Sequence, residues 1–322
     1  MQVARGSVTA APVVPSAAPI AAPLGSILSV TVMVIGASGL LGRALVPMLL
    51  VRDEVRACVR RTEAAEPLRA LGAKVAVGSF DEPDPLAEIL KRVHTVFHLV
   101  GGPNQPRDDA VLAANHGSVL TALSACREAG VRRFVLVSAT GASVEARNAY
   151  LRAKGLAEEA VANSGMEHAI IRSTHAYGVG GLWLAATAEA ATASPPFVIG
   201  DGSQSLAPVS AGDVGAVLAA ADDGDGQLEG TWALEGPDAV AMSDLVSLLA
   251  APGADPPVSL PAREAASRLT DGLGIAVSET AAELFALPSR ADAPDAAAAF
   301  GVERTALAIG LRATAQVAGA ER

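Results

Sequence analysis

Short apolar runs alternate with longer amphipathic segments from residue 30 to residue 177. The apolar runs, which are typical of buried strands, are "VTVMVIG", "VRACVR", "KVAVG", "TVFHLVG", "RFVLVS" and "HAIIRS". The segments between them have the amphipathic pattern of helices. Strands that alternate with helices predict right-handed βαβ units, and therefore an α/β fold with a doubly wound parallel sheet.

The alternation breaks after Tyr177. Residues 178–210 contain one predicted helix and a loop rich in Pro and Gly, whereas residues 211–236 have the pattern of a helix and a strand that return to the sheet. Residues 237–322 are helical in pattern and rich in Ala. We therefore predict a main domain from residues 30–177 and the returning segment, with the remainder forming a smaller, mostly helical lobe. Such a lobe would bind substrate over the carboxyl edge of the sheet.

The stretch before the first strand has a different composition, rich in Ala, Pro, Val and Ser. Its prolines, at positions 12, 15, 19 and 23, prevent a continuous helix. They also break the apolar core that a secretory signal needs, and Arg5 is the only basic residue available to such a signal. We therefore expect residues 1–29 to be a disordered tail and the protein to be cytoplasmic.

The charge and the reactive side chains exclude several classes of partner. The formal net charge is −10 at pH 7 and the pI is about 5.0, whereas nucleic acids and anionic membranes bind to basic surfaces. The two cysteines, Cys58 and Cys126, form no CxxC pattern, and the five histidines have no metal-ligand spacing. We therefore expect a small-molecule substrate, with no nucleic acid, membrane or metal, and a protein that is a monomer or a homodimer.

The segment "VIGASGLLG" places three glycines, Gly36, Gly39 and Gly42, between the first predicted strand and the first predicted helix. In that position the first glycine allows a tight turn, the second lets the backbone approach a pyrophosphate, and the third lets the helix pack on the strand. The pyrophosphate would lie at the helix N-terminus, where free N–H groups point outward. The pattern predicts a dinucleotide site, which also includes the remaining residues of the turn, Ser38, Leu40 and Leu41.

The second predicted strand ends in "CVRRTE", with Arg60 and Arg61 where a site that prefers NAD usually has Asp or Glu. A guanidinium group binds a phosphate through paired hydrogen bonds, so both residues favour the 2′-phosphate of NADP. The alternative is that both arginines are ordinary surface residues, and NAD is then the other candidate cofactor.

One tyrosine and one lysine stand four positions apart in "AYLRAKGL", although the chain has only two tyrosines and three lysines. This spacing places Tyr150 and Lys154 on one face of a helix. Ser138 ends the fifth predicted strand, before that helix. Together with the glycine turn, these residues resemble the short-chain dehydrogenase/reductase superfamily. The likeness is to its extended and atypical members, namely NmrA-like, complex I accessory-subunit-like and nucleoside-sugar epimerase-like proteins.

Further motifs extend the resemblance over about residues 30–177. "HLVGG", with Val100 and Gly101, is similar to the family's turn after the fourth strand, and "LAANHGS" has Asn115 at the position of its helix asparagine. "IIRSTHAYGVGG" resembles a segment of the extended members. The resemblance implies a dinucleotide-binding Rossmann domain in which Val100 and Gly101 contact the cofactor. The catalytic residues that it implies are Ser138, Tyr150, Lys154 and Asn115.

Two positions depart from the family pattern. In "VGSFDEP", Ser79 stands where the family often has an Asp that contacts adenine, and Phe80 follows it. We expect both residues beside the cofactor. Ser173 stands where a Pro usually follows "IIR". Both departures concern the geometry of the cofactor site and leave the predicted fold unchanged.

The predicted roles follow from proton chemistry. An unperturbed Tyr hydroxyl has a pKa of about 10, which is too high for easy proton transfer at neutral pH. The Lys154 ammonium, with an oxidised nicotinamide, would lower the pKa of Tyr150, so that the hydroxyl gives a proton to a carbonyl or takes one from an alcohol. The resemblance implies that Lys154 also binds the nicotinamide ribose and that Ser138 orients the substrate oxygen. His175 and Tyr177, just past the sixth strand, either line the substrate pocket or are packing residues.

These residues predict an enzyme, an NADP-dependent oxidoreductase that transfers hydride between NADP(H) and a carbonyl or alcohol. The Ala- and Leu-rich second lobe suggests a small apolar or polyketide-like substrate. One alternative is a non-catalytic NAD(P) redox sensor of the NmrA type, which would need the glycine turn but neither Tyr150 nor Lys154. Another is an epimerase, a dehydratase or a non-redox catalyst that uses the same pair with a retained NAD.

Overall fold

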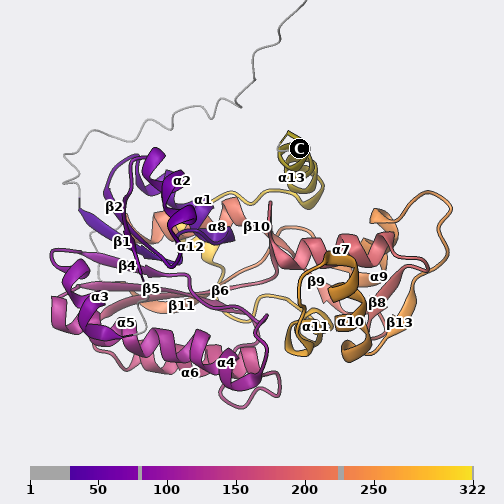
Figure 1. The fold of residues 1–322 in the computed structure, drawn as a ribbon, viewed down its shortest axis with the longest axis horizontal. Coiled ribbons are helices and arrows are strands. Elements are labelled where there is room, and N and C mark those ends of the chain that lie inside the picture. Colours follow the sequence, from indigo (N-terminus) through magenta and orange to yellow (C-terminus); the bar gives the residue numbers. More distant parts are fainter. Residues whose placement is uncertain (1–29, 79–81, 224–227, 321–322) are drawn as a thin grey trace, which may run out of the picture.

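The computed structural model describes residues 30–78, 82–223 and 228–320, with side chains as far as residue 318. The predicted tail at residues 1–29 and the predicted cofactor residues Ser79 and Phe80 lie outside the described residues. In the described part, a sheet covered by helices lies beside a smaller lobe (Figure 1).

Seven parallel strands form the central sheet in the order β3–β2–β1–β4–β5–β6–β11. Their bounds are β1 Thr31–Ile35, β2 Glu54–Val59, β3 Lys74–Val77, β4 Thr95–His98, β5 Arg133–Ala139, β6 Glu167–Ser173 and β11 Glu229–Leu234. The strand order reverses between β1 and β4, the point at which doubly wound sheets bind ligands. The predicted doubly wound parallel sheet is confirmed, and the strand after residue 211 extends its edge.

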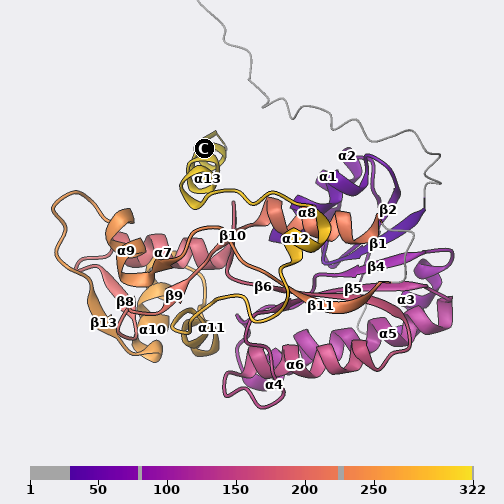
Figure 2. The same cartoon turned by 180° about the vertical axis from the view of Figure 1, so that it is seen from behind.

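Helices cover both faces of this sheet, as its apolar strands require (Figures 1 and 2). Alternate residues of β1 face opposite sides, so Val32 packs into the core under α1 and α8, and Met33 into the core under α3 and α5. The bounds of the covering helices are α1 Leu40–Leu49, α2 Ala65–Ala70, α3 Pro83–Leu90, α5 Ser118–Ala129, α6 Ala149–Ala162 and α8 Ala211–Asp222.

The helical segment between β4 and β5 is interrupted. It consists of α4 (Asp108–Leu112), a π-helical turn (η2, Ala113–Gly117) and α5. The turn contains Asn115, whose side chain binds the loop after β4, so the interruption lies at a predicted site residue.

The smaller lobe has its own apolar core, formed by side chains such as Trp183, Phe197, Leu245, Leu269 and Phe285. Its main elements are α7 Leu182–Thr192, β8 Phe197–Ile199, β9 Ser205–Leu206, β12 Val240–Ala241, α9 Met242–Leu249, β13 Val258–Leu260, α10 Ala262–Leu273 and α11 Glu279–Phe285. The predicted mostly helical lobe is therefore present. Between it and the sheet lies a two-stranded ribbon of β7 (Ala176–Tyr177) and β10 (Val209–Ser210).

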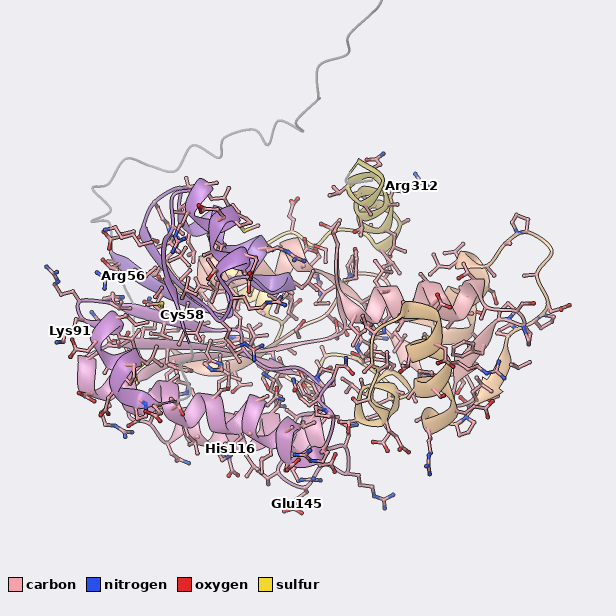
Figure 3. The ribbon with its side chains drawn as sticks, viewed as in Figure 1. Arg56, Cys58, Lys91, His116, Glu145 and Arg312 are labelled. Atoms are coloured by element: carbon pink, nitrogen blue, oxygen red, sulfur yellow. The ribbon has the colours of Figure 1, made fainter. Side chains whose placement is uncertain are left out.

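The end of the chain departs from the predicted lobe. The short helix α12 (Ala296–Phe300) packs on the sheet domain, because the small side chains of Ala296 and Ala297 fit into the core beside α8 and β11. The last helix, α13 (Leu307–Ala320), contacts the lobe core through Leu307 and Leu311, and Figure 3 shows Arg312 on it. Residues 237–322 therefore do not all belong to the lobe.

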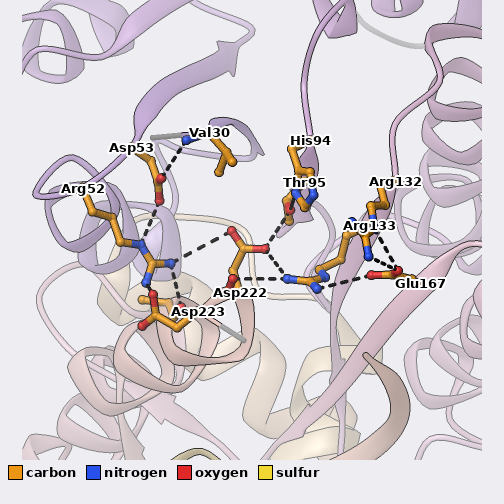
Figure 4. A network of polar contacts seen from close by, with 11 residues as sticks. Val30, Arg52, Asp53, His94, Thr95, Arg132, Arg133, Glu167, Asp222 and Asp223 are labelled. Carbon is orange, nitrogen blue, oxygen red and sulfur yellow. Dashed lines mark hydrogen bonds and ion pairs between the residues drawn. The ribbon is translucent and has the colours of Figure 1, made fainter. Parts of the chain in front are cut away.

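Buried charges connect the amino ends of the strands (Figure 4). Asp222, at the end of α8, accepts hydrogen bonds from Arg133 Nη1 at 3.0 Å and from Thr95 Oγ1 at 2.7 Å. Arg133 also pairs with Glu167 at 3.2 Å, which joins β5 to β6. The side chains of Asp222 and Arg133 are 2% and 3% exposed, so water screens this pair little.

We expect Asp222→Asn to lower the free energy of unfolding by about 3 kcal/mol, because it removes the negative partner of a buried guanidinium group. Urea denaturation of the purified protein measures this change. The matched control is Glu264→Gln, which breaks the exposed Glu264–Arg268 pair and should cost less than about 0.5 kcal/mol. Equal effects of the two changes would contradict the stabilising role of the buried pair.

Candidate active site

A cavity of about 400 Å³ lies between the carboxyl ends of β5 and β6 and the small lobe. Several elements contribute lining residues. They are 137–141 at the end of β5 and just after it, 173–176 from the end of β6, Leu41 on α1, Pro103 after β4, Tyr150 and Leu151 on α6, Leu182 and Trp183 on α7, and residues of the segment 284–289. This is the edge at which sheets of this kind bind their ligands.

The helix that contains Tyr150 begins at Asn148. The Oδ1 atom of Asn148 accepts hydrogen bonds from the backbone N–H groups of Tyr150 at 3.1 Å and Leu151 at 3.4 Å, which caps the helix. Tyr150, in the first turn, is half-buried and lines the cavity.

Ser138 lines the same cavity from the end of β5. Its side chain is 2% exposed, and its Oγ has no hydrogen-bond partner among the described residues. A buried hydroxyl without a partner is costly, so a ligand oxygen at this point would stabilise it. The structure thus brings Ser138 and Tyr150 together at one cavity.

Lys154 lies one helical turn after Tyr150 and is buried. Its Nζ donates a hydrogen bond to the Val137 carbonyl at 2.9 Å and lies 5.8 Å from the centre of the Tyr150 ring. Burial lowers the pKa of Lys154 to about 8, and the negative charge of Glu158 partly opposes this shift.

The pKa of Tyr150 moves in the direction opposite to the one predicted. Burial raises it, because the phenolate would lose its hydration. The hydroxyl of Tyr150 therefore keeps its proton at neutral pH and can donate it to an acceptor.

The glycine turn has the geometry that a pyrophosphate needs. Gly36 has a φ of +94°, and a side chain at Gly42 would lie 2.4 Å from the carbonyl oxygen of Ala37. Gly39 caps α1, whose first turn has neither a side-chain cap nor an acidic residue, and Ser38 beside it is exposed. The Gly39 N–H donates to the Gly36 carbonyl at 3.1 Å, but no side chain caps the first N–H groups of α1, so these can bind an anion and the pyrophosphate of a dinucleotide fits here.

The same turn reaches the cavity. Leu41 lines the cavity, while Leu40 is covered by the loop after β7, where side chains added at Gly178 and Gly181 would approach it to 3.0 and 3.1 Å. Arg43 fastens that loop by a 2.7 Å hydrogen bond to the Val179 carbonyl. A dinucleotide on the turn would therefore lie next to Ser138 and Tyr150.

Arg60 and Arg61 directly follow β2 and are exposed. Neither side chain has a hydrogen bond or an ion pair with another described residue. Their location agrees with the expected position of the adenosine ribose in this type of sheet, and their role in cofactor choice stays a prediction.

Asn115 is buried and is not among the described residues that line the cavity. Its Nδ2 donates to the carbonyls of Val111 at 2.9 Å and Gly102 at 3.1 Å, and its Oδ1 accepts from the Gly102 N–H at 3.0 Å. A side chain at Gly101 would lie 2.2 Å from that Oδ1. Asn115 therefore positions the turn after β4 that contains Val100 and Gly101.

Of the two residues expected after the sixth strand, His175 lines the cavity, but Tyr177 is not among the described lining residues. Tyr177 is 1% exposed and packs beside Gly310 of α13, where an added side chain would lie 2.0 Å from its hydroxyl oxygen. Of the two alternatives for Tyr177, the structure thus supports packing.

An aromatic group forms one side of the cavity. The His175 ring is nearly parallel to Trp183, with centroids 5.2 Å apart and an interplanar angle of 9°, and it meets the edge of Phe285 at 5.8 Å. The Nε2 of His175 and the Nε1 of Trp183 are buried without hydrogen-bond partners among the described residues. Burial lowers the pKa of His175 to about 4, so its ring is neutral at neutral pH.

Trp183 and the segment at 284–289 line the cavity but are not predicted by the sequence patterns. Trp183 is one of only two tryptophans and follows "YGVGG", so its rarity in an aromatic-poor chain was a usable signal. The segment at 284–289 reaches the cavity only through the packing of the lobe, and its local pattern gives no sign of that.

Two further features bear on the chemistry. Among residues 30–78, 82–223 and 228–320, no group of three or more His, Cys, Asp or Glu side chains is placed to bind a metal ion, and no helix combines the length and apolarity needed to cross a bilayer. Cys58 and Cys126 are free and buried, and burial raises the pKa of each thiol to about 12, which keeps both unreactive.

Comparison with known proteins gives the family. A family model described as NAD(P)H-binding matches residues 36–222. The chain is 31% identical over 242 residues to the mitochondrial NADH dehydrogenase (ubiquinone) 1 alpha subcomplex subunit 9 of Arabidopsis thaliana, and the match covers 70% of the chain but only 58% of that relative's length.

Another relative matches over nearly its whole length. It is the (4-alkanoyl-5-oxo-2,5-dihydrofuran-3-yl)methyl phosphate reductase of Streptomyces griseus, 27% identical over 281 residues, which are 80% of the chain and 94% of the relative. Among solved structures, MoeE5 in complex with UDP-glucose and NAD has a TM-score of 0.68 at 23% identity and covers 88% of the chain and 97% of its own. At that identity the likeness shows the fold alone.

The burial of Lys154 predicts a dependence of stability on pH. Its pKa in the folded protein is about 8, below the ordinary value of 10.5, so between these values the unfolded chain binds a proton that the folded one does not. The free energy of unfolding should therefore receive a contribution from Lys154 that rises with pH across this window.

Lys154→Met should remove that rise and increase the free energy of unfolding at about pH 7 by about 2 kcal/mol, because the cost of burying the ammonium disappears. Urea denaturation at about pH 7 and about pH 9.5 measures both effects. Lys91→Met, which changes an exposed lysine, is the control and should follow the unmodified protein. If the free energy of unfolding changed with pH equally in Lys154→Met and in the unmodified protein, the rise would not come from Lys154.

Proposed function

Because the chain belongs to the NAD(P)H-binding family, we propose that it is an NADP-dependent oxidoreductase that reduces a carbonyl group or oxidises the corresponding alcohol. The observation that supports this best is the shared cavity of Ser138 and Tyr150, beside the first turn of α1. A buried hydroxyl without a partner and a protonated tyrosine are the groups that a carbonyl oxygen requires.

In the direction of reduction, Tyr150 donates its proton to the substrate oxygen, and Ser138 donates a hydrogen bond to the same oxygen. A nicotinamide dinucleotide, held by the glycine turn, would supply the hydride for the carbonyl carbon. Lys154, with its ammonium near the ring, stabilises the phenolate that remains on Tyr150. In the reverse direction that phenolate accepts the proton of the alcohol.

Two observations favour this proposal over a sensor without catalytic activity. A sensor would need the glycine turn but would have no use for a proton donor beside an unpartnered serine hydroxyl at the same cavity. The Streptomyces griseus relative is also named as a reductase.

Tyr150→Phe should reduce kcat for NADPH-dependent carbonyl reduction by at least about 100-fold, because it removes the proton donor and keeps the ring. The loss of NADPH absorbance with a panel of ketones and aldehydes measures the rate, and a fluorescence titration should find NADPH binding unchanged. Tyr177→Phe makes the same change at the other tyrosine and should leave kcat within about twofold. Turnover that survives Tyr150→Phe would disprove the role of this hydroxyl.

Arg60 and Arg61 give the proposal a separate test through cofactor choice. If they bind the 2′-phosphate, NADPH should bind roughly tenfold or more tightly than NADH, since a hydrogen bond to a charged group contributes about 1.5–3 kcal/mol. The double change Arg60→Ala with Arg61→Ala should remove most of this preference and leave NADH binding nearly unchanged. Salt should weaken the preference, because both side chains are exposed.

Arg312→Ala, at an exposed arginine of α13, is the control for the loss of positive charge and should keep the ratio of the two affinities. Equal affinities of the unmodified protein for NADH and NADPH at low salt would rule out the NADP assignment.

A further inference from the structure

We propose that the cavity selects an uncharged, largely apolar carbonyl compound, and that Trp183 and His175 bind a second polar group of that compound. This inference rests on the proposed oxidoreductase function, and it concerns the class of substrate that the site accepts.

The first support is the absence of charge in the cavity. None of the described residues that line it has a charged side chain. Of the nearby cations, Arg172 pairs with Glu158 at 2.7 Å and with Asp292 at 3.2 Å, whereas Lys154 is not among the described lining residues and its Nζ donates to the Val137 carbonyl. A carboxylate or phosphate in the cavity would therefore lose hydration without forming an ion pair with a lining residue, which is strongly unfavourable.

The second support is the chemistry of the aromatic side. Trp183 is 5% exposed, and its Nε1 can only donate a hydrogen bond, whereas the neutral His175 ring has one donor and one acceptor nitrogen. Both unpartnered nitrogens belong to residues that line the cavity. A carbonyl, ether or hydroxyl oxygen on the substrate would pair with Trp183 Nε1 and remove the cost of burying it.

The apolar side chains of the lining favour a substrate that is itself largely apolar. Leu41, Val137, Leu182 and Phe285 contribute apolar surface around Ser138 and the paired rings. Apolar parts of a ligand gain free energy from burial against such side chains, and a planar ring packs well beside the aromatic group.

Ligands with phosphate groups are therefore expected to bind poorly. MoeE5 was solved with UDP-glucose, and the Streptomyces griseus relative is named for a substrate that is a phosphate. Phosphates are usually bound by Arg or Lys side chains, and the described lining of this cavity has neither. The lack of Arg and Lys in the described lining distinguishes this chain from a nucleotide-sugar enzyme on the same fold.

The two tryptophans provide a direct test. Trp232, on β11, packs against Phe300 and is not among the residues that line the cavity, so Trp232→Phe leaves Trp183 as the sole emitter. This variant is titrated, with and without NADP, with para-methylacetophenone, with para-acetylbenzoate and with UDP-glucose. We expect the neutral ketone to quench Trp183, and the carboxylate of matched size and UDP-glucose to require at least about tenfold higher concentrations.

The second variant, Trp183→Phe, keeps the ring and loses the N–H. We expect it to raise KM for a neutral ketone with a second oxygen acceptor, para-methoxyacetophenone, by about two- to tenfold, with NADPH affinity unchanged. Trp232→Phe is the matched control and should leave KM unchanged.

The outcomes separate this inference from the proposed function. Selective quenching by the neutral ketone supports the ligand class even if no NADPH is consumed, a result that would defeat the oxidoreductase proposal alone. Equal quenching by the ketone and the carboxylate, tighter binding of UDP-glucose, or no quenching by any of the three overturns the inference, whether or not carbonyl reduction is observed.

Discussion

The amide side chain of Asn148 joins the two regions on which the site depends. Its oxygen caps α6 two residues before Tyr150, and its Nδ2 donates to the Thr280 carbonyl at 3.0 Å and to Glu283 at 3.3 Å. One buried group thus fixes both the start of the helix with the proton donor and the position of α11, whose last residue, Phe285, lines the cavity. An apolar residue at this position would lose both the helix cap and the hydrogen bonds to α11.

The described residues that line the cavity have no charged side chain, and the ion pairs lie around it. The network around Asp222 lies at the amino ends of the strands, where it ties α8 to β4 and β5 (Figure 4). At the carboxyl ends, the ion pairs of Arg172 connect α6 with the segment that returns from the lobe. Because these charged side chains are paired with one another, none of them lines the cavity. Hydrogen bonds from a few buried polar groups provide its specificity.

The sequence predicts those features whose causes are local. The strands are apolar on both faces, so their pattern alone gives the sheet and its parallel order. The glycine turn is similarly predictable, since the contact of Gly42 with Ala37 lies within six residues of chain. Tyr150 and Lys154 are also placed correctly on one helix, because their spacing is set by that helix.

Features that depend on distant parts of the chain are not predictable in this way. His175 and Tyr177 are two residues apart and would face the same side of a regular strand, but β7 leaves the sheet to pair with β10, and Tyr177 meets α13 instead of the cavity. The position of α12 depends on a core that α8 and β11 form together. The predicted direction of the Tyr150 pKa was wrong because a sequence shows the neighbouring charge but not the burial.

Burial also explains how the lobe affects proton transfer without supplying the proton donor. Lys154 is buried at a cost, which the negative charge of Glu158 on the same helix reduces. Glu158 is held in place by Arg172, and Arg172 in turn binds Asp292, whose carboxylate also accepts the Gly141 N–H at 2.7 Å. Asp292 follows the lobe helix α11 in the chain. Docking of this segment therefore fixes both the loop after Ser138 and the carboxylate that keeps Lys154 charged at neutral pH, so the acid–base pair depends on contacts that reach it through the lobe.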